Sequence, residues 1–204
     1  MKTTYQQALA HSMSYAEYRD LVSTLLAAGR TTGPASSEAL LHYTKLNVQR
    51  MNRLDKTVVL GEALQVAVQT LPEPYTWLVI SEGWCGDAAQ ILPVLAAAAE
   101  ASLGRIELRI VLRDQHLDLM DQHLTRGGRA IPKLLVLRTE DLALLATWGP
   151  KPQPAQEQFW AQKEAGISYE LRSETLHRWY AQDKTLTLQA ELTALMGQLH
   201  LESA

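Results

Sequence analysis

A single cysteine, Cys85, lies between an apolar segment and a helix-like segment of this 204-residue chain. One cysteine cannot form an internal disulfide, so the fold must be stabilised by its apolar core, without a covalent cross-link. Hydrophobic residues make up 47% of the sequence, which suits an ordinary globular protein. Residues 77–89 read W-L-V-I-S-E-G-W-C-G-D-A-A. The apolar run predicts a short buried strand that ends just before Cys85.

Charge and hydropathy restrict the classes of partner. The formal net charge of -3 provides no polycationic surface for nucleic acid. No stretch approaches the roughly 18 uninterrupted apolar residues of a membrane span, and the N-terminus lacks the apolar run of a signal peptide. A lone cysteine fits a reducing compartment. We therefore expect a soluble cytoplasmic protein with no nucleic-acid or membrane partner. The sequence does not indicate its oligomeric state.

The N-terminal third has helical patterns. Ser14 and Glu17 have the spacing of a capping box, which predicts a helix start at this point. A second helix would begin near Ser36 or Ser37, and a short third one would cover residues 62–70. Apolar residues recur at helical spacing in these segments, so we expect their apolar faces to pack against the main domain.

A strand-rich pattern follows. Four strands are predicted at residues 77–80, 106–113, 134–137 and 142–147. Helical spacing begins after Cys85 and recurs at residues 117–124, where Gly127 and Gly128 would end the helix. Two parallel strands followed by an antiparallel hairpin, with helices between them, predict an α/β sandwich.

The C-terminal segment again has helical patterns. Pro150, Pro152 and Pro154 would form a stiff connection after the sheet. Three helices are predicted, over residues 156–165, after a cap at Ser168, and around residues 188–199. Their apolar faces would either dock on the sheet or form a dimer interface, and docking is the commoner arrangement.

The W-C-G-D-A segment resembles the W-C-G-P-C active-site motif of the thioredoxin family, with Ala88 in place of the second cysteine. Three further features match that family: the helix-kinking proline, the cis-proline segment and the glycine after the last strand, at Pro93, Ile131-Pro132 and Gly149. The layout is similar to a bacterial group of single-cysteine thioredoxin family proteins. The resemblance implies a thioredoxin-like core at residues 74–150, an N-terminal helical extension at 1–73 and a C-terminal helical extension at 151–204.

The resemblance also implies a site. Cys85 would be the nucleophile, and Ile131 would offer backbone hydrogen bonds to an extended substrate. Trp84 would line the rim of the substrate groove, and Gly86, Asp87 and Pro132 would complete it. We expect Cys85 to begin a helix, with a solvent-accessible sulfur in contact with Pro132. The Ile131–Pro132 bond is expected to be cis, as in the family.

Two departures from the family bear on the chemistry. Val79 occupies the position of the buried acid that thioredoxins place six residues before the nucleophile. Together with Ala88, it removes both groups that usually assist resolution of the mixed disulfide. A helix start favours the thiolate form of Cys85, whereas the carboxylate of Asp87 disfavours it.

Two functions stay open. The first is a thiol–disulfide oxidoreductase in which Cys85 attacks a protein or small-molecule disulfide, and glutathione or another low-molecular-weight thiol resolves the product. The second is a redox-inactive module that holds a polypeptide at Trp84 and Ile131. An iron–sulfur carrier is disfavoured, because monothiol glutaredoxins have C-G-F-S and T-V-P where this chain has C-G-D-A and A-I-P. A peroxidase is disfavoured because Glu82 replaces the threonine of peroxiredoxins.

Other polar groups have simpler interpretations. His116 and His123 could share a helix face, but a metal site needs three or four ligands, so no metal site is predicted and both are expected on a solvated surface. Arg126 and Arg129 flank two glycines near the proposed site. A glycine helix stop with two exposed arginines is the preferred interpretation, and anion binding is the alternative.

Overall fold

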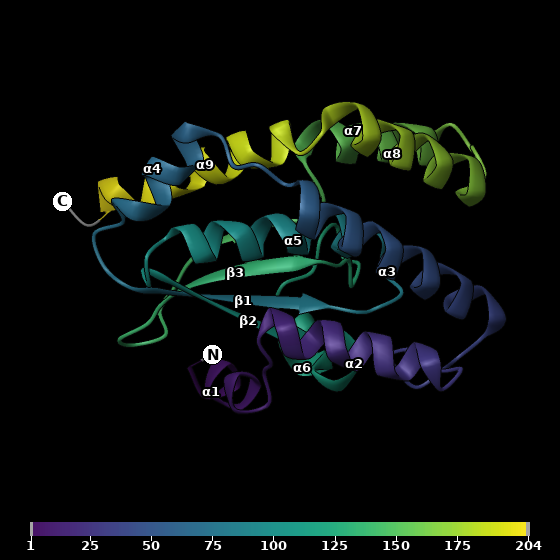
Figure 1. Ribbon diagram of the computed structural model, residues 1–204, viewed down its shortest axis with the longest axis horizontal. Helices are drawn as coiled ribbons and strands as arrows, with labels where there is room; N and C mark the ends of the chain where they lie inside the picture. The colour runs from purple at the N-terminus through teal and green to yellow at the C-terminus, as the bar shows by residue number, and fades with distance from the viewer. Residues whose placement is uncertain (1, 203–204) are drawn as a thin grey trace.

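A four-stranded mixed sheet forms the centre of the computed structural model, which describes residues 2–202 (Figure 1). The strands are β1 (Tyr75–Ser81), β2 (Ile106–Leu112), β3 (Lys133–Arg138) and β4 (Leu144–Trp148), in the order β2-β1-β3-β4. β1 pairs in parallel with β2 and antiparallel with β3, and β3 pairs antiparallel with β4. The predicted order of two parallel strands and an antiparallel hairpin is confirmed.

Helices cover both faces of this sheet. On one face lie α1 (Lys2–Ala10), α2 (Tyr15–Ala27) and the one-turn α6 (Leu117–Met120), which follows the 3-10 turn Arg113–Gln115. On the other face α5 (Gly86–Ala101) lies against the sheet beneath α4 (Glu62–Gln69) and α9 (Leu186–Glu202), with α3 (Glu38–Thr57) beside it (Figure 1). The chain is therefore an α/β sandwich with helical extensions at both ends.

The main core contains side chains from all parts of the chain. β1 is buried along its whole length because it is a central strand covered on both faces. Tyr5 and Tyr18 from the N-terminal helices and Leu192 and Met196 from α9 belong to the same core. Both extensions thus share the core of the sheet. The apolar residues of α9, which could also have formed a dimer interface, are buried in this core.

The last two helices before α9 form a layer with a small core of its own. They are α7 (Gln153–Glu164) and α8 (Tyr169–Asp183), and we call them together the roof. Ala155, Leu176 and Tyr180 are its buried residues, with Phe159 and Trp179 packed against them. Figure 1 shows the roof above the N-terminal end of α5. This position places it over the segment that contains Cys85.

Several predicted helix starts are confirmed by their caps. The Ser14 hydroxyl accepts a hydrogen bond from the Glu17 amide, and the Glu17 carboxylate accepts one from the Ser14 amide at 2.7 Å, which completes the capping box. Ser37 and Ser168 cap α3 and α8 in the same manner, each accepting from the amide three residues later.

Two helix boundaries were predicted wrongly. The helix expected over residues 117–124 ends at Met120, because the amides of Gln122 and His123 bond to carbonyls three residues earlier, in tight turns, instead of four. The connection expected to extend through Pro154 is shorter, since α7 begins at Gln153 and contains Pro154 in its first turn. Proline is compatible with a first helical turn because the amide there needs no intrahelical acceptor.

None of the helices in the described residues combines the length and the apolar character that crossing a bilayer requires.

Candidate functional site

Cys85 is the N-cap residue of α5, directly after β1. Its Sγ accepts a hydrogen bond from the Ala88 amide at 3.5 Å and donates one to the Ile131 carbonyl at 3.3 Å. The residue is only 7% exposed, so the expectation of a solvent-accessible sulfur is wrong. A thiol that donates to a carbonyl carries its proton. The resting site therefore holds Cys85 as a neutral thiol.

The electrostatic surroundings agree with a protonated sulfur. Burial raises the pKa of the Cys85 thiol to about 12, and the negative charge of Asp87 acts in the same direction. The Ala88 amide and the Lys151 ammonium lower this pKa, but by less. The helix N-terminus favours the thiolate, as the sequence indicates, yet desolvation outweighs it.

The loop facing the cysteine contains a cis peptide bond between Ile131 and Pro132, and both residues are buried. Gly149 supports this loop from the end of β4. Its φ is +111°, and a Cβ at this position would lie 2.4 Å from the Pro132 carbonyl oxygen. Only glycine fits this backbone conformation and this close approach. The family glycine noted in the sequence thus packs directly against the loop.

Asp87 is held by two residues of the C-terminal extension. One carboxylate oxygen lies 3.2 Å from Lys151 Nζ, and the other accepts a hydrogen bond of 2.6 Å from the Tyr180 hydroxyl. Burial raises the pKa of Asp87, while Lys151 and Tyr180 oppose that rise. The carboxylate that repels a Cys85 thiolate is therefore also the link between α5 and the roof.

His177 from α8 lies directly on Gly86. A Cβ at Gly86 would approach His177 Cε1 to 2.9 Å and Nε2 to 3.1 Å, so the absence of a side chain permits this contact. Burial, followed by repulsion from Arg50, lowers the pKa of His177 to about 4. The imidazole is therefore neutral at pH 7. Its buried Nδ1 has no hydrogen-bond partner among the described residues.

These groups surround a cavity of about 250 Å³. Five residues that the sequence predicted for the site border it: Trp84, Cys85, Gly86, Asp87 and Ile131. The structure does not place Pro132 among the bordering residues. The opposite wall comes from the C-terminal extension and includes Lys151, Phe159, Tyr169, Leu176 and His177.

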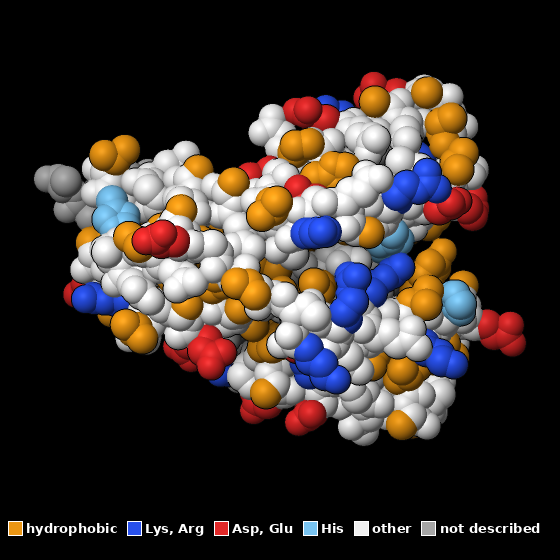
Figure 2. Space-filling view, turned by 45° about the horizontal axis from the view of Figure 1, so that its top comes forward, with side chains coloured by type: hydrophobic (Ala, Val, Ile, Leu, Met, Phe, Trp, Pro, Cys, Tyr) orange, Lys and Arg blue, Asp and Glu red, His pale blue; other side chains and the backbone are white. Residues whose placement is uncertain are grey.

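Basic side chains border the same cavity. Arg113 lies 4.8 Å above the Trp84 ring and forms an ion pair with Asp114 at 2.8 Å. Arg129 also borders the cavity and forms an ion pair with Asp121 at 2.6 Å. Figure 2 shows Lys and Arg side chains gathered beside the hollow that separates the roof from the rest of the molecule. The entrance is thus positively charged, although acids partly neutralise it.

The structure also places the arginines and histidines for which the sequence predicted no role in the site. Arg129 borders the site, whereas Arg126 lies over the Trp160 ring at 3.7 Å, outside it. His123 was expected on a solvated surface, and that is wrong: it is 9% exposed, and its Nε2 is 3.2 Å from the Tyr5 hydroxyl. The N-terminal helix α1 covers it, which no local pattern reveals.

Sequence reasoning missed the residues that close the site. Lys151, His177 and Tyr180 contact the site from positions more than 60 residues after Cys85. Helical periodicity indicates only that α8 has an apolar face, and the partner of that face is a tertiary property. Glu82 was considered only because it stands where peroxiredoxins have a threonine. It is fully buried, accepts from the Asp114 amide at 2.9 Å, and has a pKa raised by burial.

Histidine and acidic side chains do not gather into a metal site in the described part of the chain. Within residues 2–202, no group of three or more His, Cys, Asp and Glu side chains is placed to hold a metal ion. His116 and His123 belong to different clusters, since His116 contacts His11, with ring centroids 6.1 Å apart.

Comparisons with known proteins agree with this fold. No curated protein is detectably similar in sequence. A solved structure of a protein of unknown function, PA1234, from Pseudomonas aeruginosa superposes with a TM-score of 0.56 at 22% identity, covering 94% of this chain and 99% of that one. An HIV epitope-scaffold superposes with a TM-score of 0.55 at 22% identity, covering 91% and 99%. At this identity the likeness concerns the fold alone.

A protein-family model described as Thioredoxin matches residues 33–165. The match covers more than half of the chain and contains the whole sheet, Cys85 and the cis-proline loop. This chain therefore belongs to the thioredoxin family.

Proposed function

We propose that this protein is a single-thiol exchange protein in which Cys85 reacts with a small disulfide inside the cavity beneath the roof. The observation that carries the proposal is the position of the sulfur. Cys85 caps α5, faces the Ile131 carbonyl and borders a cavity of about 250 Å³. A small molecule that enters this cavity when the roof opens would meet the sulfur, where a thiolate would receive the Ala88 hydrogen bond.

The reaction requires two thiol–disulfide exchanges. The Cys85 thiolate attacks one sulfur of a disulfide RSSR, the S–S bond breaks, and RS⁻ leaves and takes up the proton that Cys85 released. A second thiol, glutathione or another low-molecular-weight thiol, then attacks the mixed disulfide and releases Cys85. Ala88 cannot perform this second step, so the resolving thiol must come from outside the chain.

The closed site makes Cys85 unreactive, because the roof buries its thiol. A pKa of about 12 leaves very little thiolate at neutral pH. Burial is the main cause, so displacement of α8 that admits water or substrate lowers this pKa. The roof has a separate small core and reaches α5 through Asp87 and Gly86. These limited contacts support a gate that opens while the sheet stays folded.

The same roof favours a small substrate over a polypeptide. In an open thioredoxin groove, the substrate chain lies along the loop before the cis-proline. Here Tyr169, Leu176 and His177 stand across that space. The Arg113 and Lys151 side chains at the cavity favour a disulfide with carboxylate groups.

The intact mass of the protein after incubation with oxidised glutathione tests the proposal. We expect one glutathionyl adduct, whose rate of formation saturates with disulfide concentration and which reduced glutathione removes. Cys85→Ser is the matched blank, because the chain has no other cysteine. Absence of an adduct above this blank would contradict the exchange function.

A second candidate is a redox-inactive binding protein, and a specific observation favours it. Cys85 is 7% exposed and its pKa is raised, as expected for a cysteine retained for packing. In that case Cys85→Ser or Cys85→Ala would leave the protein's binding properties unchanged, and Cys85 would react only when the protein unfolds.

A further inference from the structure

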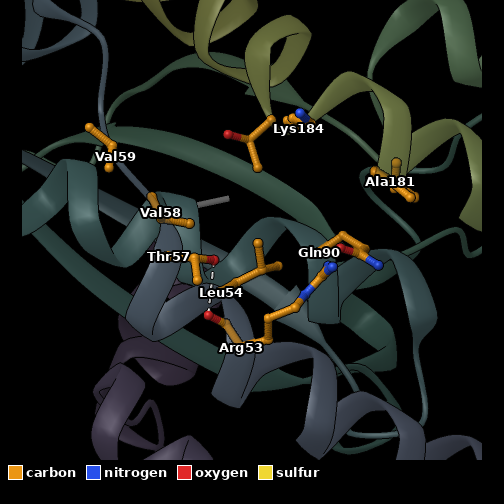
Figure 3. A pocket seen from close by; sticks show the side chains of 10 residues that line it. Arg53, Leu54, Thr57, Val58, Val59, Gln90, Ala181 and Lys184 are labelled. Carbon is orange, nitrogen blue, oxygen red and sulfur yellow. Dashed lines mark hydrogen bonds between the residues drawn. The ribbon is translucent and has the colours of Figure 1, made fainter.

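A second cavity, with a volume of about 420 Å³, lies between the C-terminal end of α3 and the C-terminal end of α8. Figure 3 shows its walls, with Gln90 of α5 at one side. Tyr180 lines this cavity and also donates its hydroxyl hydrogen bond to Asp87 of the Cys85 site. Tyr180 thus links the two cavities, which share no lining residue.

Gln90 is the most informative residue of this cavity. Its side chain is 7% exposed and forms no hydrogen bond with any residue that the structure describes, and its amide is not among the polar groups sealed inside the protein, so the amide is open to the cavity. A polar amide at the wall of a concave, largely apolar cavity is the kind of group that orients a bound small molecule. Gln90 borders the cavity, so a molecule bound there would supply its partner, for which the amide offers two N–H donors and one carbonyl acceptor.

The charges around the cavity select the sign of that molecule. Arg53 of α3 extends toward Gln90, and Lys184, at the end of α8, lies across the cavity (Figure 3). Neither side chain forms an ion pair with another described residue, and the residues that line the cavity include no Asp or Glu. An anionic group would receive charge-assisted hydrogen bonds from Arg53 together with the Gln90 amide.

The remaining wall is apolar. Leu54, Val58, Val59 and Ala181 line it, and Val59 is 81% exposed. A cavity that combines an apolar wall with a few convergent polar groups is typical of small-molecule sites, and its volume lies within their usual range. The ligand therefore needs an apolar body in addition to its anionic group.

We propose that this cavity is a binding site for a small amphipathic carboxylate. The carboxylate accepts hydrogen bonds from Arg53 and Gln90, with Lys184 adding positive charge, and the apolar body packs on Leu54 and Val58. The site is independent of thiol chemistry, since no lining residue is Cys85.

Titration of the ¹⁵N-labelled full chain with sodium decanoate, followed by NMR, tests this assignment. We expect saturable shifts at the end of α3, around Gln90 and around Lys184. Arg53→Gln should weaken binding by about tenfold or more, because it removes the charged donor. Lys56→Gln is the matched control, since Lys56 lies one turn away on α3, exposed and outside the cavity, and it should leave affinity within about twofold.

A second ligand and a second variant complete the test. Decanol has the same apolar body without the charge, and it should bind at least about tenfold more weakly than decanoate. Gln90→Leu should weaken decanoate binding while preserving the fold. Equal binding of decanol and decanoate, an unchanged affinity in Arg53→Gln, or shifts confined to another surface would overturn the assignment.

Discussion

Asp87 has two opposed effects on the site at the scale of single residues. Its carboxylate binds Tyr180 of the roof and Lys151 just before the roof, and its charge raises the pKa of Cys85. Asp87→Asn removes the like charge and leaves the Lys151 ammonium to favour the thiolate. We expect the rate of Cys85 alkylation by iodoacetamide at pH 8 to rise by roughly threefold to tenfold, as a fall of up to one pKa unit implies.

A neutralised acid elsewhere controls for the change in net charge. Asp118 lies exposed on α6, so Asp118→Asn should alkylate like the wild type. An Asp87→Asn rate at or below the wild-type rate would show that burial alone masks the thiol.

His177 makes the stability of the protein depend on pH. Its folded pKa of about 4 lies below the ordinary histidine pKa of 6.5, so between these values the unfolded chain binds the proton more tightly. The contribution of His177 is fully present above pH 6.5 and is lost as the pH falls through 6.5 toward 4. We expect acidification over this window to cost the wild type on the order of 1 kcal/mol more than His177→Asn, or about 2–4 °C in Tm.

Thermal unfolding of both proteins at pH 7, 6, 5 and 4 measures this difference. Asp87 and Glu82 also titrate, and their raised pKa values act in the opposite direction, so only the difference between the two proteins isolates His177. Parallel curves for wild type and His177→Asn would contradict a buried neutral imidazole.

The contact between α5 and α8 is the element-scale feature on which the closed site depends. Gly86→Ala would place a Cβ 2.9 Å from His177 Cε1, so we expect a loss of about 1–2 kcal/mol and faster Cys85 alkylation. Adding His177→Ala should recover most of the stability, which a double-mutant cycle by urea unfolding measures. Gly128→Ala is the control, because its Cβ would meet only an ordinary contact of 3.5 Å.

The first turn of α5 also tests the missing second thiol. The Ala88 amide lies 3.5 Å from Cys85 Sγ, so Ala88→Cys places a second sulfur one helical turn from the first. We expect an internal disulfide on oxidation and a mixed-disulfide lifetime shortened by about tenfold or more, followed by intact mass over time. Ala89→Cys, displaced around the helix, should not shorten it. An internal disulfide without any disulfide-reducing activity would favour the redox-inactive candidate, since Val79 provides no acid.

Local sequence signals predicted the elements better than their contacts. The caps at Ser14, Ser37 and Ser168 and the junction between β1 and α5 follow from side chains that interact within a few positions. The roof over Cys85 could not be predicted, because His177 and Gly86 are 91 positions apart and neither has a local pattern that indicates the other. Desolvation of the sulfur follows from that contact, which explains why its exposure was predicted wrongly.

At the scale of the whole molecule, the division of the core matters most. The sheet, α5 and α9 share the main core, whereas the roof has a separate cluster around Tyr180 and Leu176. Elements with few apolar contacts to the rest of a protein can open without global unfolding. The exchange function requires such an opening, because the closed site holds Cys85 as a neutral, buried thiol.

The rate of Cys85 mixed-disulfide formation with oxidised glutathione, measured across urea concentrations below the unfolding transition, tests this account most directly. Opening of the roof alone exposes little surface, so the account predicts a rate that changes only slightly with urea. A rate that rises with the full urea dependence of global unfolding would mean that Cys85 reacts only in the unfolded chain. That result would contradict a gated exchange site and identify Cys85 as a packing residue.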